Sequence, residues 1–306
     1  MIFLALIAVL LLEYFRPLDV RNPAALIFTR YANHLERHFN AGESAHGKVA
    51  WLLGALLPAM IVGAIYGVLS YFSPLLALPF GVAVLYAVLS LKRIGVQAER
   101  IADALRSSDI AEARRQLAQW QGRSADDFET PEIARVGIEQ SLAGAHNNLF
   151  GVIAWFVVLG PAGAVLYRLS QLLSRKWEAL DEPEICQFGQ FATQIFGLMD
   201  WLPLRLTAIS FAIVGDFEDA VYCWRTQASA WMSQGIGIVL ASGAGALGVK
   251  LGEPLNYGGS IEFRPELGLG DEADADYLDS AVSLIWRAVV LWLVLLLLLT
   301  IAGWAG

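Results

Sequence analysis

The chain has 306 residues, of which 57% are hydrophobic and 16% charged, and its formal net charge at pH 7 is −8. Soluble domains carry about 25% charged residues, so this composition excludes an ordinary water-facing surface and indicates an integral membrane protein. The negative charge disfavours a nucleic-acid partner, which would need a basic face. The two cysteines, Cys186 and Cys223, form no CxxC pair and are expected to be small apolar residues.

The N-terminal third predicts three membrane helices. Ile2 to Leu12 is apolar, and its charges follow the run instead of preceding it, so we expect a retained first helix and not a signal peptide. Residues 49–91 contain no charged residue and are long enough for two spans of about 20 residues each. Ser73–Pro74 is the expected turn between them, because proline ends one helix and can begin the next.

Two basic segments, 16–48 and 92–147, flank this pair of spans. The positive-inside rule places both in the cytoplasm of a bacterium, with the spans in its inner membrane. Both segments are expected to be helical. The markers are an apolar repeat at Ile27, Tyr31, Leu35 and Phe39, a second one at Ile94, Ile101 and Leu105, a helix start at Asp109 with Glu112, and an N-cap at Thr130 before Pro131.

The apolar stretch from Leu149 to Tyr167 is interrupted by Gly160–Pro161. A straight crossing would carry Arg168 to the outer side, against the charge rule. A re-entrant or broken helix would avoid this and would indicate a cavity, since irregular backbone at membrane depth must be buried in protein or line a cavity. A proline kink in an ordinary span is the alternative, and the residues leave both open.

Asp200, Pro203 and Arg205 mark a second expected break, within Phe188 to Val214. Charges in an apolar run usually face a partner or a cavity, although an interfacial segment anchored by Trp201 explains them equally well. The sequence GAGALG, residues 243–248, formally fits GxGxxG, but no strand precedes it, so we expect its glycines to permit close helix packing. No strand-type alternation is seen.

The last span is expected from Ala281 to Trp304. The five acids between Asp271 and Asp279 before it can favour a helix start or hold a hard cation. The predicted fold is therefore an all-α polytopic membrane protein with about four to six transmembrane or re-entrant helices plus cytoplasmic amphipathic helices. Its expected regions are 1–91, 92–147 and 148–306.

Four segments occur in an order that resembles the CobD/CbiB family of membrane proteins of cobalamin biosynthesis. They are GPAGAVLYR (160–168), LPLRLTA (202–208), GALGVKLGEPLNYGG (245–259) and RPELG (264–268). The resemblance covers roughly residues 138–287. The protein called AmpE, linked to β-lactamase regulation, is also similar through the first helix, the DWLPLRL stretch and the apolar C-terminal span.

The family resemblance implies a reaction that joins an aminopropanol, or its phosphate, to a corrinoid propionate with ATP and a divalent cation such as magnesium. This chain departs from the family at several polar positions. Glu139 remains, but a later acid is absent; two aspartates are replaced by Phe196 and Gly197; and a Pro-Asn and a Glu are missing near Ser233 and Gly237.

Two functional hypotheses follow. The loss of acids favours a divergent protein with altered or lost ligase chemistry and an AmpE-like signalling or scaffold role, whereas the kept LNYGG and RPELG segments favour a cobalamin-pathway amide synthase. A transporter is a third class, disfavoured by the lack of a repeat. Beyond membrane lipid, the implied ligands are a corrinoid or a cell-wall-related molecule.

Eight residues are candidates for the site under either hypothesis, and no protein metal ligand is predicted. Glu139 and Asp200 are the catalytic candidates. The arginines and lysine among the others would meet phosphate or carboxylate. The substrate-binding candidates are His146, Arg168, Arg205, Lys250, Asn256 and Tyr257.

Overall fold

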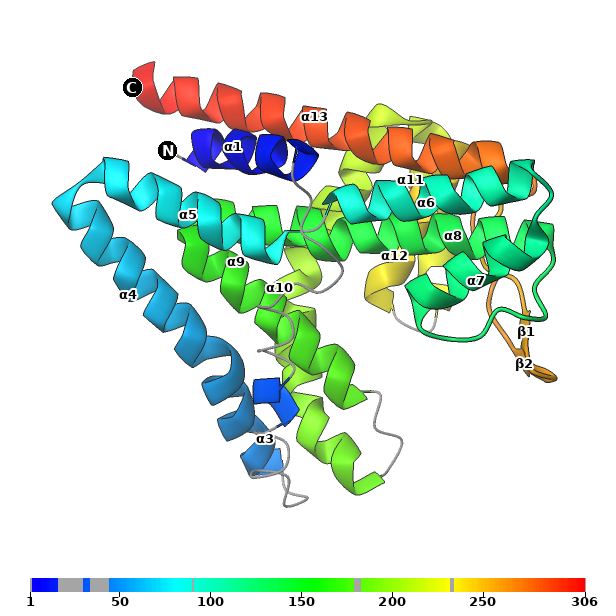
Figure 1. The fold of residues 1–306 in the computed structure, drawn as a ribbon, viewed down its shortest axis with the longest axis horizontal. Coiled ribbons are helices and arrows are strands. Elements are labelled where there is room, and N and C mark those ends of the chain that lie inside the picture. Colours follow the sequence, from blue (N-terminus) through cyan, green and yellow to red (C-terminus); the bar gives the residue numbers. More distant parts are fainter. Residues whose placement is uncertain are drawn as a thin grey trace. The chain divides into compact units, whose positions relative to one another are not determined.

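The structure is a computed structural model that describes residues 2–15, 30–33, 44–89, 91–178, 183–231 and 234–305 (Figure 1). The chain divides into two compact units. Unit 1 comprises residues 1–90 and 147–201, and unit 2 comprises residues 91–146 and 202–306. The Ile27–Phe39 repeat lies outside the described residues except for 30–33, which are helical.

The described chain is almost entirely helical, as predicted. Its α-helices are α1 (Ile2–Phe15), α3 (Ser44–Trp51), α4 (Leu57–Phe72), α5 (Pro74–Val88), α6 (Leu91–Arg106), α7 (Ile110–Gln121), α8 (Thr130–Ala145), α9 (Gly151–Glu178), α10 (Pro183–Val214), α11 (Phe217–Gln227), α12 (Gln234–Leu247) and α13 (Ala275–Ala305). Five helices in the described ranges are long and apolar enough to cross a membrane. Large apolar side chains of α4 and α13, such as Met60 and Leu299, are more than half exposed, which suits contact with lipid. The chain is an all-α polytopic membrane protein.

In unit 1, α4 and α5 meet at a sharp corner at Ser73, as predicted (Figure 1). Ser73 has an extended backbone, and its hydroxyl accepts a hydrogen bond from the Leu75 N–H at 3.3 Å. The side chain therefore caps α5, while Pro74 takes a helix position where no N–H is needed. The predicted pair of spans and its turn are confirmed.

Helix α9 is broken at Gly160 and folds back on itself. Gly160 has φ 62° and ψ −149°, a combination that only glycine adopts readily. A Cβ added to Gly151 would lie 2.1 Å from the Tyr167 hydroxyl, although a straight helix would separate these residues by about 24 Å at about 1.5 Å per residue. Arg168 likewise hydrogen-bonds Asn148. The Gly160–Pro161 break is thus a helical hairpin, which confirms a broken helix and not a simple proline kink.

The second predicted break is wrong, because α10 continues as one helix through Pro203. Proline removes the N–H that would bond to the Met199 carbonyl four residues earlier. The indole N–H of Trp155 donates to this carbonyl at 3.1 Å instead. The carbonyl is satisfied without interrupting the helix.

Unit 2 is built from α6, α7, α8, the end of α10, and α11–α13. The side chains of Ile94, Ile101 and Leu105 are buried on α6, as their spacing predicts. The Asp109 carboxylate accepts from the Glu112 N–H at 3.0 Å and begins α7. The predicted N-cap at Thr130 is one residue too late: Glu129 caps α8, and its N–H donates to the Glu132 carboxylate at 2.7 Å.

The glycines of α12 allow close helix packing. A Cβ on Gly245 would lie 2.4 Å from the Asp219 carbonyl oxygen of α11, and one on Gly243 would lie 2.7 Å from the Leu142 side chain of α8. This is the packing role expected for the GAGALG sequence. One of the acids before α13 favours the start of that helix, as expected: the Asp274 carboxylate accepts a hydrogen bond from the Asp276 N–H at 2.9 Å.

A short antiparallel hairpin, β1 (Leu255–Tyr257) with β2 (Ser260–Glu262), corrects the expectation of no strands. Gly258 and Gly259 join the strands with φ 62° and 85°. Positive φ at both positions is the geometry of a two-residue hairpin turn. Three-residue strands are too short for alternation to be recognisable in the sequence.

Candidate functional site

A cavity of about 240 Å³ lies in unit 2 between α8, α12, the segment after α7, and the β-hairpin. Its lining includes the apolar side chains of Val136, Ile236 and Leu240. The polar residues of the lining are Gln121, Arg123, Glu139, Gln140, Tyr257, Glu262 and Arg264.

Glu139 and Arg264 form a buried ion pair in the lining of this cavity. The side chains are 8% and 9% exposed, and the guanidinium donates to the Glu139 carboxylate. The same carboxylate oxygen accepts from the Gly252 N–H at 2.8 Å, and Arg264 also donates to the Gly252 carbonyl at 3.1 Å. A buried charge must be paired and hydrogen-bonded, and this carboxylate is both.

Gly252 is required for that arrangement. Its φ is 79°, and a Cβ at this position would lie 1.9 Å from the Pro265 carbonyl oxygen. Any other residue would push apart the two chain segments that bring Gly252 and Arg264 to Glu139. The glycine of GEPLNYGG and the arginine of RPELG therefore serve one site.

Arg123 holds the hairpin against the segment after α7. Its guanidinium donates to the Glu262 carboxylate at 2.9 Å and lies 3.9 Å from the centre of the Tyr257 ring. The Asp127 carboxylate accepts from the Gly258 N–H at 2.8 Å. Burial raises the pKa of the Tyr257 phenol above its usual value, so this group is neutral at physiological pH.

A second ion pair stands beside the first. Arg135 of α8 donates to the carboxylate of Glu253, next to Gly252. Arg135 and Arg264 each keep a buried Nε with no hydrogen-bond partner among the described residues. Guanidinium groups with free donors in a low-dielectric site are suited to carboxylate or phosphate.

The other unit 2 candidates lie outside the cavity lining. The Asn256 side chain accepts from the Gly259 N–H at 2.9 Å and so stabilises the hairpin turn. Lys250 lies 3.8 Å from Glu266. His146 is fully buried and shares a 2.9 Å hydrogen bond with the Thr207 hydroxyl, and Arg205 is half-buried on α10. Of the predicted residues, the cavity brings together Glu139 and Tyr257.

Two further candidates belong to a polar cluster in unit 1. The Asp200 carboxylate is 6% exposed and accepts from the Tyr167 hydroxyl at 2.8 Å. Arg168 donates to Asn148 and, at 2.5 Å, to the Gln171 side chain. This cluster stands at the open end of the α9 hairpin.

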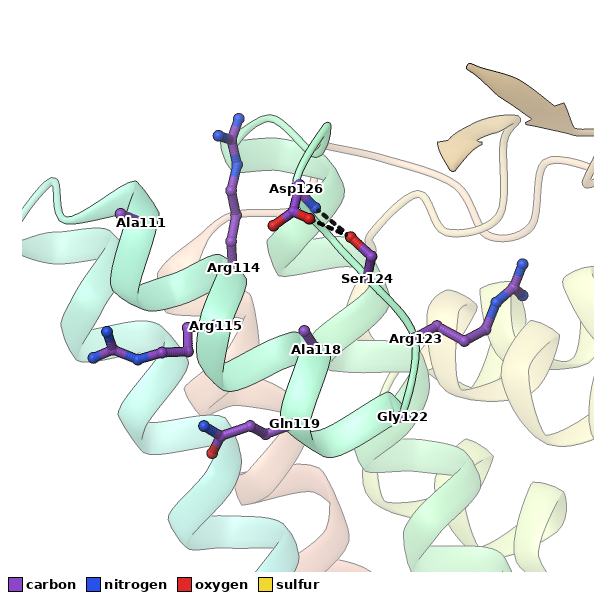
Figure 2. A pocket seen from close by; sticks show the side chains of 9 residues that line it. All are labelled: Ala111, Arg114, Arg115, Ala118, Gln119, Gly122, Arg123, Ser124 and Asp126. Atoms are coloured by element: carbon purple, nitrogen blue, oxygen red, sulfur yellow. Dashed lines mark hydrogen bonds between the residues drawn. The ribbon is translucent and has the colours of Figure 1, made fainter. Parts of the chain in front are cut away.

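Figure 2 shows a second concavity of unit 2, an open depression beside α7. Three arginines line it, but their side chains point in different directions: Arg114, Arg115 and Arg123. Arg114 donates to the Phe128 carbonyl at 2.7 Å, and Arg115 pairs with Glu112. The depression therefore offers no convergent set of cations for an anion.

The family resemblance implies ATP and magnesium. In the described part of the chain, no three His, Cys, Asp or Glu side chains are grouped so as to hold a metal ion. Two acids of the stretch between Asp271 and Asp279, which could hold a cation, form ion pairs within the protein instead. Asp276 and Asp279 pair with Arg106 at 2.8 and 2.5 Å. These residues do not fit an all-protein magnesium site.

The residues that sequence reasoning missed are the arginines and their partners: Arg123, Arg135, Glu253, Glu262 and Arg264. Arg264 and Glu253 stand inside the segments RPELG and GEPLNYGG that carry the resemblance. Their place in these segments is the sequence signal that could identify them as site residues. No such signal distinguishes Arg123 and Arg135 from the other basic residues of the 92–147 segment.

Comparisons with known proteins identify the family of this chain. The family described as CobD/Cbib protein matches residues 4–285. A "Cobalamin biosynthesis protein CobD" of Stutzerimonas stutzeri is 36% identical over 99% of this chain and 98% of its own. A protein of the same name from Chromobacterium violaceum is 36% identical over 72% of this chain and 70% of its own. No solved structure matches. The chain belongs to the CobD/CbiB family.

Proposed function

We propose that this protein acts in cobalamin biosynthesis as an amide-forming synthase of the bacterial inner membrane. It joins the amine of an aminopropanol, or of its phosphate, to a propionate of a corrinoid in an ATP-dependent reaction. The observation that carries the proposal is the relative named for cobalamin biosynthesis that is 36% identical over 99% of this chain. Similarity over nearly the full length favours this hypothesis over the AmpE-like signalling role.

The polar cavity of unit 2 supports the proposal chemically. The substrates of such a reaction carry carboxylate and phosphate groups, and the cavity presents Arg264 and Arg123 to them. Glu139 is the buried acid of its lining and remains our catalytic candidate there. ATP, when bound, would supply the activation of the carboxylate. The C–N bond would form as the C–O bond breaks, the oxygen leaving on the phosphate or AMP derived from ATP and the amine losing a proton.

The residues that lie elsewhere keep separate proposed roles. Asp200 and Arg168 of unit 1 are candidates for a second substrate contact. His146, Arg205, Lys250 and Asn256 are weaker candidates, because His146, Lys250 and Asn256 have structural partners and none of the four lines the cavity. We further propose that residues 16–48 and 92–147 face the cytoplasm, where ATP is available.

Complementation tests the proposal. The gene is expressed in a bacterium that lacks its corrinoid amide synthase and is supplied with a corrinoid precursor from upstream of that step. We expect cobalamin-dependent growth from the wild type, and none from Glu139→Gln at equal membrane abundance. Ala118→Leu, on α7 away from the cavity, is the control variant and should support growth. No growth from well-expressed wild type, beside growth with the Stutzerimonas stutzeri relative, would overturn the proposed function.

A further inference from the structure

We propose that the tip of the β-hairpin, residues 256–262, is a lid that opens and closes the unit 2 cavity. Arg123 holds this tip in the closed position. The foot of the hairpin, residues 251–255 and 263–267, stays in place when the tip moves. This inference concerns access to the cavity, and it goes beyond the proposed reaction without depending on it.

The hairpin tip forms part of the wall of the cavity. Tyr257 and Glu262 of the tip belong to its lining. Arg123 of the segment after α7 also lines the cavity and contacts both of them. Most other lining residues stand on α8 and α12. Displacing residues 256–262 would therefore remove part of the wall and leave the helices where they are.

The foot of the hairpin is fixed to the body of unit 2. Leu251 and Leu267 are fully buried and exchange two backbone hydrogen bonds, at 2.7 and 2.9 Å. The Leu255 side chain is buried as well. Glu253 has φ 63°, which a residue other than glycine keeps only where its surroundings hold it, and its carboxylate pairs with the buried Arg135. Movement is therefore confined to the residues beyond Leu255.

The contacts of Arg123 with the tip are exposed to water. In the ion pair with Glu262, the two side chains are 56% and 36% exposed, whereas those of Glu139 and Arg264 in the foot pair are 8% and 9% exposed. Exposed ion pairs are weak and are screened by salt, and a buried pair is costly to break. The Arg123 guanidinium over the Tyr257 ring adds a second weak contact at 3.9 Å. The tip should therefore open while the foot stays closed.

The remaining contacts of the tip join it to the same segment after α7. The Gly258 N–H donates to the Asp127 carboxylate, and the Tyr257 ring meets the edge of the Phe128 ring at 5.0 Å between centroids. On the other face of the strand, Ile261 is 66% exposed, so little packing resists movement in that direction. A hairpin with three-residue strands is marginally stable by itself. The closed position therefore depends on this one set of contacts.

Hydrogen exchange of the full chain in detergent tests the lid. Mass spectrometry compares peptides from the tip, residues 256–262, with peptides from the foot around Leu251. We expect the tip to exchange faster than the foot, and Arg123→Gln to accelerate the tip about tenfold further. Arg115→Gln is the matched control, because this guanidinium pairs with Glu112 on its own helix, and it should leave the tip unchanged. Equal tip exchange in the two variants would overturn the proposal.

Salt and charge reversal identify the ion pair as the element that holds the lid. About 1 M sodium chloride should accelerate exchange at the tip and not at the foot, because the exposed pair is screened. Arg123→Glu places a carboxylate against Glu262 and should accelerate the tip more than Arg123→Gln does. Adding Glu262→Arg to this variant should restore most of the protection. A double variant as unprotected as Arg123→Glu would reject the pair as the closing contact.

A cysteine in the lining connects the movement to access. Val136 lines the cavity and is 2% exposed, so in a variant without native cysteines Val136→Cys should react slowly with a methanethiosulfonate reagent. Arg123→Gln should raise this rate about tenfold, in step with the exchange of the tip, and Arg115→Gln should not. Faster exchange of the tip with an unchanged labelling rate would show another entrance and reject the lid.

The lid and the proposed function fail independently, because neither measurement uses a substrate. A lid that opens as described in a protein that does not complement would leave this inference standing. Complementation by a protein whose tip exchange and Val136→Cys labelling are both insensitive to Arg123→Gln would support the function and reject the lid.

Discussion

Glu139 and Arg264 are 125 residues apart in sequence and form an ion pair in which both side chains are less than one-tenth exposed. Such a pair links α8 to the segment after the β-hairpin. The contribution of this pair to stability depends on both partners, because each buried charge would be costly without the opposite charge beside it.

Breaking this pair from one side should therefore destabilise unit 2. We expect Glu139→Gln or Arg264→Gln each to lower the free energy of unfolding by about 3–5 kcal/mol, because one buried charge is left alone. The double variant should lose much less than the sum. Thermal unfolding of the four proteins in detergent, analysed as a double-mutant cycle, measures this; additive losses would show that the two side chains do not interact.

The hairpin in α9 makes a prediction for Gly160. Gly160→Ala should cost about 1–3 kcal/mol through backbone strain alone, since the nearest atom to an added Cβ is a Tyr66 ring carbon at 3.9 Å. Gly197→Ala is the matched control, because this helical glycine has φ in the usual range and nothing within 4 Å of an added Cβ. Thermal melts compare the two, and equal stability of both variants would argue against the break.

The same hairpin predicts the sidedness of the residues that follow it. In a variant without native cysteines, Arg175→Cys and Gln119→Cys should both react with a membrane-impermeant maleimide in inside-out vesicles and resist it in intact cells. The positions are exposed on α9 and α7 respectively. Opposite labelling of the two would mean that α9 crosses the membrane straight.

We expect Tyr257 to make the stability of the folded protein depend on pH in the alkaline range. Burial raises the pKa of the folded-state phenol above its unfolded value of about 10. Its contribution to stability is therefore complete below about pH 10 and is lost as the pH rises toward the folded-state pKa. Melting temperatures between pH 8 and 11 should fall less steeply for Tyr257→Phe than for the wild type, while other titrating groups affect both proteins alike; parallel curves would refute this.

The Cys223 thiol should not react with maleimide in the folded protein. It is fully buried, and its burial raises the pKa of the thiol to about 11, so little thiolate exists near neutral pH. We expect wild type and Cys223→Ser to take up the same amount of maleimide at pH 7.5 when folded, with a difference of one label only after denaturation in detergent. Labelling of folded protein that disappears in Cys223→Ser would contradict the burial.

Local signals in the sequence were sufficient for the spans and the corner at Ser73, because proline, capping residues and apolar length act over a few residues. The break at Pro203 was mispredicted since its compensation comes from Trp155, a long way off in the chain. The site was only partly predictable for the same reason. Glu139 and Tyr257 were identified, but no local pattern reveals that Arg123 lies across the Tyr257 ring.

The order of the two units along the chain also has a consequence during synthesis. Residues 91–146 of unit 2 are made before residues 147–201 of unit 1, and the rest of unit 2 follows. At about 5–20 residues per second, Glu139 is added to the chain roughly 6–25 seconds before Arg264. In that interval Glu139 lacks its ion-pair partner, so unit 2 can close around its cavity only when translation is nearly complete.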